Sequence, residues 1–324
     1  MSIRIAALAL SIGAVALPAD AAEYPDHAIR MVVPFAAGGG TDVLARIIAQ
    51  NLNSKWGQPV VVENQPGASG AIGTRAVMKA PPDGYTLLMA STGALMAVSA
   101  SAEGGAPFDV NKYLTPIAIG AAPPYLLVAS PTLPVKTTAD LIRYARQKPE
   151  GLTFGSSGVG AASHLSGLLF AGETGIRMLH VPYKGTGPAV TDLLGGRIDV
   201  MFAPGPVVQQ FVASGQLKAL GVTDTRRSKF YPDVPTVADA VPGYESVGWF
   251  GLLAPPNTPP DIVGRLNEVI VAAMQTPEFR DHLATLGAEP TLQTPEQFGR
   301  YINADVAKWS KLVKDNDVQL PGGK

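Results

Sequence analysis

Two glycine-rich segments carry the residue types that bind anions through the backbone. Residues 36–42 read AAGGGTD and residues 155–164 read GSSGVGAASH. Each follows a predicted strand and opens a predicted helix, so the N–H groups of a first helical turn lie beside backbone that glycine lets a ligand approach. Thr41 is a suitable N-cap, and the helix dipole favours a carboxylate without any cationic side chain. Either segment alone could be a tight turn, but two at equivalent positions indicate one ligand held from both sides.

Motifs for catalysis or metal binding are missing from the sequence. There is no GxxxxGK[ST] phosphate loop and no GxSxG nucleophile elbow. Ser163 and His164 are adjacent, which turns them to different faces of a helix and makes them a poor nucleophile–base pair. The chain has no cysteine, and its histidines lack metal-ligand spacing: His27, His164, His180 and His282. We expect no catalytic residue, no metal and no cofactor, and structural roles for the histidines, with His164 undecided.

The N-terminus predicts export. Arg4 precedes an apolar run over residues 5–17, and Ala19-Asp20-Ala21 supplies an A-x-A cleavage pattern. This layout is typical of a secretory signal peptide at 1–21, and the run is too short to span a bilayer. The alternative is an apolar first helix of the fold. We expect the mature chain in the periplasm, and its net charge of −1 with scattered basic residues argues against nucleic acid as a partner.

Short apolar runs alternate with amphipathic helices along the chain. The first predicted set has strands at 29–33, 60–62 and 86–90, and helices at 41–55 and 71–79. The second set has strands at 126–128, 153–154, 178–181, 200–202 and 217–222, and helices near 139–147, 161–174, 188–194 and 207–214. Three helical stretches follow, near 260–274, 277–286 and 295–314. Such alternation predicts two α/β domains with parallel sheets, and a helical tail that returns to the first.

The motifs resemble those of the periplasmic substrate-binding proteins of tripartite tricarboxylate transport systems, the Bug family. The matching segments run in order along the mature chain: YP at 24–25, VPFAAGGGTD at 33–42, VVENQPGA at 61–68, PDGYTLL at 82–88, FGSSG at 154–158, HVPYKGTGP at 180–188, DVPT at 233–236 and WFGLLAP at 249–255.

The resemblance implies a type II periplasmic-binding-protein fold, in which two α/β domains are joined by two crossing strands with a cleft between them. The crossings would lie near 116–127 and 247–253. Domain 1 would comprise residues 22–122 and 248–324, and domain 2 residues 123–247. A protein of this kind closes like a clamshell around a small carboxylate and delivers it to membrane transporter subunits. We expect a monomer that is not an enzyme.

The ligand-binding residues that the resemblance implies lie in loops at the carboxyl ends of strands. In the first domain they are Phe35, Ala36, Ala37, Gly38, Gly39, Gly40, Thr41, Asp42, Ser91 and Thr92. In the second domain they are Ser156, Ser157, Gly160, Ala161, Ser163, His164, Gly185, Thr186, Ala203 and Pro204.

Two departures from the family pattern bear on specificity. After the second glycine-rich segment many relatives carry hydroxyl or amide side chains, where this chain has Ala161 and Ala162. After Phe202 relatives often have Asp-Asn, where this chain has Ala203 and Pro204. Neutral drift is one explanation. The other is a less polar pocket that takes an aromatic or aliphatic dicarboxylate rather than citrate or an amino acid.

Three alternatives stay open at this point. A sensor that reports ligand to a membrane receptor kinase would need the same clamshell. A secreted hydrolase would need a nucleophile–base pair, which the sequence does not offer. Lys184 could pair with a far carboxylate of the ligand or be a solvated lysine at a helix start, and we favour the second.

Overall fold

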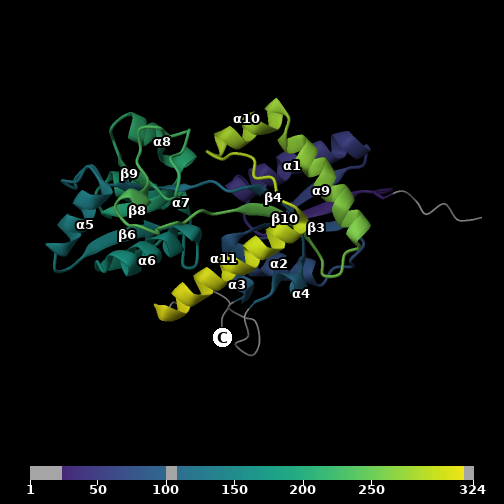
Figure 1. The fold of residues 1–324 in the computed structure, drawn as a ribbon, viewed down its shortest axis with the longest axis horizontal. Coiled ribbons are helices and arrows are strands. Elements are labelled where there is room, and N and C mark those ends of the chain that lie inside the picture. Colours follow the sequence, from purple (N-terminus) through teal and green to yellow (C-terminus); the bar gives the residue numbers. More distant parts are fainter. Residues whose placement is uncertain (1–23, 100–107, 317–324) are drawn as a thin grey trace, which may run out of the picture.

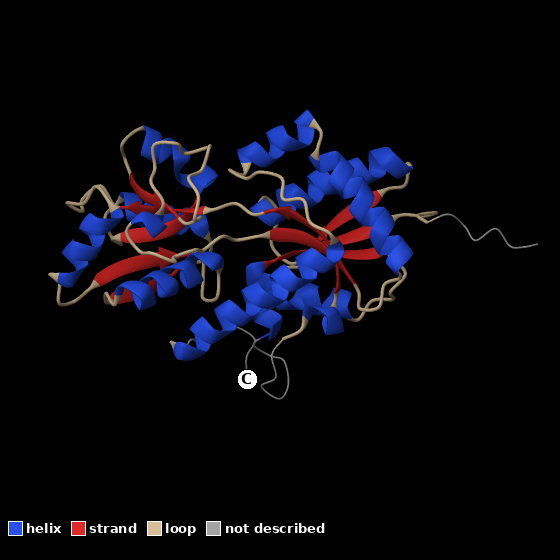
Figure 2. Ribbon diagram, in the orientation of Figure 1, coloured by secondary structure: helices blue, strands red, loops and turns tan. Residues whose placement is uncertain are grey.

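Two five-stranded mixed sheets form the framework of the molecule, and each defines one lobe (Figures 1 and 2). The computed structural model describes residues 24–99 and 108–316, so the predicted signal peptide lies outside the described residues. The first lobe has the strand order β2-β1-β3-β10-β4, and the second has β7-β6-β8-β5-β9. The predicted architecture of two α/β units is confirmed.

The first lobe is built from both ends of the described chain. Its strands are β1 (Ile29–Val33), β2 (Val60–Asn64), β3 (Thr86–Ser91), β4 (Thr115–Ala121) and β10 (Phe250–Ala254). Its helices are α1 (Gly40–Trp56), α2 (Ala71–Met78), α3 (Thr92–Ser99), α4 (Val110–Tyr113), α9 (Pro260–Met274), α10 (Pro277–Thr285) and α11 (Pro295–Asp315). The last three helices return to this lobe, as the sequence predicts.

The second lobe is a continuous stretch of the chain. Its strands are β5 (Tyr125–Ala129), β6 (Leu152–Ser156), β7 (Met178–Pro182), β8 (Val200–Pro204) and β9 (Lys218–Val222). Its helices are α5 (Thr138–Arg146), α6 (Ala162–Thr174), α7 (Thr186–Leu194) and α8 (Gly205–Ala213).

The sheets are mixed, which corrects the prediction of purely parallel sheets. β1 runs parallel to β2 and β3, and β6 runs parallel to β7 and β8. β10 is antiparallel to β3 and β4, and β5 is antiparallel to β8 and β9. The reversed strand in each sheet is the one that the chain enters directly after crossing from the other lobe.

The two crossings lie side by side between the lobes. The chain leaves β4 for β5 through residues 122–124 and returns to β10 through residues 247–249. An antiparallel bridge between Pro124 and Val247 pairs the two segments, and Figure 2 shows both running between the sheets. Paired crossings of this kind form a hinge about which two lobes can rotate.

Both faces of the sheets are covered, which explains the continuous apolar strands. In β1, Met31 and Val33 pack in the apolar cluster that includes α1, α9 and α10, and Val32 packs in the cluster with α2, α3 and α11. All three side chains are fully buried. Because strand side chains alternate between faces, a doubly covered strand needs apolar residues at successive positions.

Helix α11 also reaches the second lobe, as Figure 1 shows by its course toward α6. A capping box starts the helix, in which the Thr294 and Gln297 side chains each accept the other residue's backbone N–H. Further along, Lys308 Nζ donates to the carbonyl oxygen of Glu245. In the part of the chain that the structure describes, no helix combines the length and apolar character needed to cross a membrane.

Candidate functional site

The loop between β1 and α1 presents exposed backbone at an uncapped helix start. Residues 36–39 are exposed, and Gly39 is the N-cap, without any side-chain cap. The prediction of Thr41 as the N-cap is wrong, because Thr41 is buried one residue inside the helix. The N–H groups of the first turn are therefore available to an acceptor outside the helix.

Asp42 organises this loop. Its carboxylate accepts from Gly38 N–H at 2.9 Å, from Asn64 Nδ2 at 3.0 Å and from both Nε and Nη2 of Arg46. Burial alone would raise the pKa of Asp42, but the hydrogen bonds from Arg46, Gly38 and Asn64 lower it overall. The carboxylate is thus ionised and its charge is balanced by Arg46, so it does not confront an anion with an unpaired negative charge.

The start of α3 lies directly against the second lobe. A Cβ atom built on Gly93 would be 3.9 Å from the carbonyl oxygen of Gly160. Ser91 and Thr92 are buried beside it, and Thr92 Oγ1 donates to Asp305 Oδ2 at 3.2 Å. The predicted ligand segment at Ser91 and Thr92 therefore lies close to the glycine-rich loop of the second lobe.

The loop between β6 and α6 folds its own polar side chains back onto its backbone. Ser156 Oγ accepts from Gly158 N–H at 3.1 Å, and Ser163 Oγ accepts from Ser157 N–H at 3.0 Å. His164 Nδ1 accepts from Gly160 N–H at 3.1 Å. Gly158 and Gly160 have φ of 141° and 78°, which glycine adopts without strain. The side chains named here therefore hold the loop in its conformation.

Two stacked imidazole rings contact this loop. The rings of His164 and His180 are 3.8 Å apart, and His180 Nε2 lies 2.6 Å from Ser156 Oγ. Burial, with a contribution from His180, lowers the pKa of His164 to about 3, and burial lowers the pKa of His180 to about 4. Both rings are therefore neutral at neutral pH, as the acceptor role of His164 Nδ1 requires. No motif in the sequence indicates that β7 brings His180 to this loop.

Ser156 and His180 have the atoms of a nucleophile–base pair but not the access. Ser156 has no exposed surface, and its hydroxyl also donates to the carbonyl oxygen of Gly158. Ser163 and His164 contact different partners, Ser157 and Gly160, rather than each other. Neither pair presents a hydroxyl that a bound substrate could reach.

The starts of α7 and α8 complete the second lobe's side of the site. Gly185 N–H donates to the carbonyl oxygen of Ser157 at 3.2 Å, which joins Gly185 and Thr186 to the preceding loop. Lys184 is exposed. Ala203 is fully buried and Pro204 is the N-cap of α8, so neither adds a polar side-chain atom.

Tyr231 is a neighbour of this site that the sequence did not suggest. Its side chain is 8% exposed, and its hydroxyl has no hydrogen-bond partner within the described residues. A Cβ built on Gly205, the first residue of α8, would fall 2.1 Å from that hydroxyl, so only glycine fits there. A Cβ built on Gly287 of the first lobe would be 3.2 Å from the same atom. The Tyr231 hydroxyl therefore lies where the two lobes approach each other.

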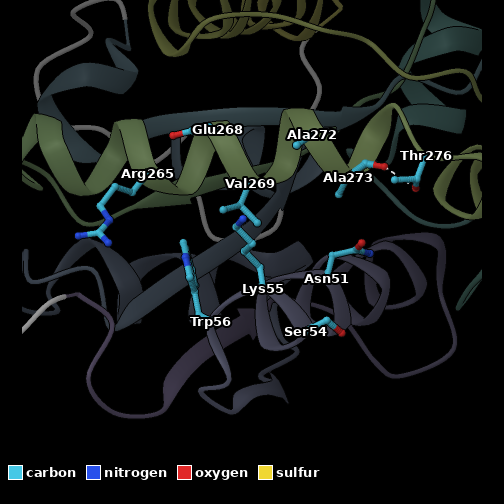
Figure 3. Close-up of a pocket in the computed structure, with 10 residues that line it drawn as sticks. All are labelled: Asn51, Ser54, Lys55, Trp56, Arg265, Glu268, Val269, Ala272, Ala273 and Thr276. Atoms are coloured by element: carbon cyan, nitrogen blue, oxygen red, sulfur yellow. Dashed lines mark hydrogen bonds between the residues drawn. The ribbon is translucent and has the colours of Figure 1, made fainter.

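A groove in the first lobe lies away from the predicted ligand residues. It has a volume of about 490 Å³ and lies between the C-terminal half of α1 and α9 (Figure 3). The residues that line it are Asn51, Ser54, Lys55, Trp56, Arg265, Glu268, Val269, Ala272, Ala273 and Thr276. None of the predicted ligand residues is among them. Within residues 24–99 and 108–316, no cluster of three or more His, Cys, Asp or Glu side chains is placed to hold a metal.

The sequence matches a known protein family and is similar to several known proteins. Residues 44–318 match the family model described as "Tripartite tricarboxylate transporter family receptor". Protein BugT of Bordetella pertussis is 37% identical over 312 residues, which span 96% of each chain.

Several solved structures are similar to this chain over most of its length. An R. palustris protein with adipate has a TM-score of 0.80 at 37% identity, covering 91% of this chain and 99% of that one. The periplasmic binding protein BugD has a TM-score of 0.77 at 35% identity, covering 91% and 99%. MatC of Rhodopseudomonas palustris with bound malate has a TM-score of 0.76 at 32% identity, covering 90% and 100%.

Proposed function

We propose a function from the premise that this chain belongs to the tripartite tricarboxylate transporter family of receptors. It is a solute-binding protein of a tripartite transport system. The proposal is that its solute is a small dicarboxylate, which is enclosed between the lobes and then delivered to the membrane subunits. The observation that carries the proposal is the approach of Gly93 in one lobe to Gly160 in the other, because it brings the start of α3, where Ser91 and Thr92 lie, against the glycine-rich loop of the second lobe.

In this proposal the ligand's carboxylates are bound by main-chain N–H groups. The starts of α1, α6, α7 and α8 have no side-chain cap. The polar side chains nearby already have partners: Asp42 with Arg46, Thr92 with Asp305, and His164 with Gly160. Uncapped helix starts with their positive dipole ends supply the remaining donors. All predicted ligand residues stay part of this proposal: those of both glycine-rich loops, with Phe35, Ser91, Thr92, Gly185, Thr186, Ala203 and Pro204.

The solute class is the second part of the proposal. Ala161, Ala162 and Pro204 place apolar atoms at two helix starts of the second lobe, and Ala203, which is fully buried, adds no polar atom before the second of them. Such a lining suits the methylene or aromatic body of a dicarboxylate better than additional hydroxyl or amino groups. The adipate in a relative of 37% identity supports an aliphatic diacid, and the malate in MatC shows that the family also holds a shorter hydroxy acid.

Calorimetry on the mature chain tests the solute class. We expect adipate or an aromatic dicarboxylate such as phthalate to bind more tightly than malate, citrate, glutamate or aspartate. Tight binding of citrate, glutamate or aspartate without binding of aliphatic or aromatic acids would refute the proposed class.

Closure is the third part of the proposal. The lobes correspond to domain 1, residues 22–122 with 248–324, and domain 2, residues 123–247, and they rotate about the bridge between Pro124 and Val247. A ligand that contacts both lobes binds only the closed form and shifts the equilibrium toward it. Saturating adipate should therefore raise the melting temperature and reduce the radius of gyration of a monomer. An unchanged radius with adipate bound would refute closure.

Export to the periplasm is the last part. The family includes the periplasmic binding protein BugD, and residues 1–21 have the pattern of a secretory signal. N-terminal sequencing of protein recovered from the periplasm should begin near Ala22. Protein retained in the cytoplasm with Met1 intact would refute it.

A further inference from the structure

Asp305 is a buried carboxylate at the meeting point of three segments. It lies on α11, is 8% exposed, and accepts from Trp249 Nε1 and from Trp309 Nε1, each at 2.7 Å. Its Oδ2 atom, which binds Trp249, also accepts from Thr92 Oγ1 at 3.2 Å. Trp249, Trp309 and Thr92 are at most 2% exposed, so water does not compete for these bonds.

The three donors come from parts of the chain with different tasks. Trp249 stands between the hinge bridge at Val247 and the first residue of β10. Thr92 is the first residue of α3, whose start faces Gly160 of the second lobe. Trp309 belongs to α11, as Asp305 does. One carboxylate therefore ties the hinge and the ligand-facing helix start to the same helix.

Helix α11 holds the hinge strand firmly at the same place. The rings of Phe298 and Trp249 meet edge to face at 5.4 Å, and a Cβ built on Gly251 would fall 2.3 Å from the Phe298 ring. Leu165 of α6 belongs to the same apolar cluster as Trp249 and Trp309, so the second lobe also packs on this helix. A change in the angle between the lobes must therefore act on the environment of Asp305.

A buried carboxylate is an expensive way to stabilise a core. Desolvation of the charge opposes burial, and apolar replacements of buried charged groups are often neutral or stabilising. Its three donors give directional bonds that an apolar side chain cannot give, and these fix the relative placement of the segments that carry them.

We propose that Asp305 is a positioning residue that couples the hinge segment at Trp249 to the ligand-facing start of α3 through Thr92. When the hinge rotates, Trp249 moves the carboxylate, and the carboxylate moves Thr92 and the first N–H groups of α3. Because the Thr92 hydroxyl gives its proton to Asp305, that hydroxyl does not donate to the ligand. The ligand arm of the test below rests on the proposed function, and the hydrogen-exchange arm does not.

The test compares Asp305→Asn with Asp315→Asn, the same change at an exposed position of the same helix. The first measurement is hydrogen exchange of the ligand-free proteins. In Asp305→Asn we expect exchange at residues 92–99 and 247–250 to rise together by about tenfold, while both segments stay unchanged in Asp315→Asn. A rise spread evenly over the first lobe would show a merely structural role, and a rise in only one segment would show no coupling. Either result overturns the proposal.

A second pair of variants changes Thr92, the other partner of the hydrogen bond to Asp305. It keeps the proposal testable if Asp305→Asn does not fold. Thr92→Val removes the hydroxyl at nearly constant volume, and Thr92→Ser keeps it. Thr92→Val should raise exchange at residues 247–250, and Thr92→Ser should restore the wild-type rate. Equal rates at 247–250 in the two variants would overturn the proposal.

The ligand arm uses adipate as the probe. Asp305→Asn should weaken adipate binding about tenfold and reduce the change in tryptophan emission on binding, because Trp249 and Trp309 both donate to this carboxylate. If wild-type protein does not bind adipate, the proposed solute fails while the exchange result still decides the coupling. If adipate binds equally well to wild type and Asp305→Asn, the coupling fails and the proposed solute stands.

Discussion

Helix starts in this molecule fall into two regions that are built differently. Away from the proposed site, α5, α10 and α11 each follow a threonine N-cap whose side chain accepts a first-turn N–H. The three caps are Thr137, Thr276 and Thr294. At the proposed site, α1, α6, α7 and α8 begin without a side-chain cap. A cap is worth about 1 kcal/mol, so the loop region gives up stability that the tail helices keep.

Proline use sharpens the contrast. Helices α10 and α11 place a proline at their first position, where the residue has no N–H to offer. Helices α1, α6 and α7 begin with Gly40, Ala162 and Thr186, which keep that N–H, whereas α8 keeps it at Gly205 but has Pro206 at its second position and so offers one donor fewer. Helices α2 and α9 are uncapped although they lie outside the site, so a missing cap alone does not mark a binding site. The comparison teaches that the helix starts of the proposed site share two features, a missing side-chain cap and a place among the predicted ligand residues.

The largest effect we expect is a pH effect on the second lobe. Burial lowers the pKa of His164 to about 3 and of His180 to about 4, and the unfolded chain binds these protons near pH 6.5. Stability is therefore full above pH 6.5 and falls as the pH drops toward 3. The pKa shifts correspond to about 3 kcal/mol per ring at pH 4, and because His180 is partly exposed, solvent screening reduces the loss for the pair to on the order of 2–4 kcal/mol. Melting curves between pH 8 and pH 4 measure it.

The control for the pH effect is His180→Asn, which removes one titrating group. Its melting temperature should depend less on pH than that of the wild type between pH 6.5 and pH 4. Identical pH slopes for the two proteins would show that the imidazole pair does not set the acid stability of this lobe.

The next effect concerns one backbone donor. Ala162→Pro removes the first N–H of α6, and Ala161 before it has ψ of 155°, which a following proline accepts. Loss of one charge-assisted hydrogen bond should weaken adipate binding by about 10- to 100-fold. Ala162→Ser keeps the N–H and should bind within a few-fold of wild type. Calorimetry measures adipate binding by both variants. Equal affinities would show that the first N–H of α6 does not bind the carboxylate.

A smaller effect is expected from adding a side-chain cap to a helix of the proposed site and removing one from a helix outside it. Ala161→Asp places a capping carboxylate at the start of α6, which should raise stability by about 1 kcal/mol while it weakens adipate binding. Thr276→Ala removes the cap of α10 and should lower stability by about 1 kcal/mol with unchanged affinity. Denaturant melts and calorimetry measure both quantities. If Ala161→Asp leaves affinity intact, the start of α6 does not bind the carboxylate.

The smallest effect is expected at Lys184. The side chain is exposed beside Gly185, and the proposed site binds carboxylates through backbone dipoles rather than cations. Lys184→Ala should change the adipate dissociation constant less than about twofold, in line with a solvated surface lysine. A tenfold loss at low and at high salt would mean that Lys184 pairs with the ligand.

Local pattern was enough to predict most of the framework. The apolar runs at 29–33 and 200–202 and the tail helix near 295–314 correspond to β1, β8 and α11. Helix α3 was missed because its sequence TGALMAVS is apolar on nearly all sides and shows no helical periodicity. The reversed directions of β5 and β10 depend on where the chain crosses between lobes, which no local pattern records.

The sequence was enough to locate the two glycine-rich helix starts of the proposed site, but not the side-chain contacts around them. Glycine spacing located the starts of α1 and α6, since glycine is needed where backbone meets ligand. The partners of Asp42, His164 and Thr92 come from residues that are distant in the chain, such as Asn64, His180 and Asp305. Such contacts between distant parts of one lobe follow from packing, so sequence reasoning could not assign them.

The most direct test of the account is a crystal structure of the mature chain with adipate. We predict one adipate between the lobes, with its carboxylate oxygens within hydrogen-bond distance of N–H groups at the start of α1 or α3 and at the start of α6. Adipate bound to one lobe only, or in the groove between α1 and α9, would contradict the claim that facing helix starts hold the solute.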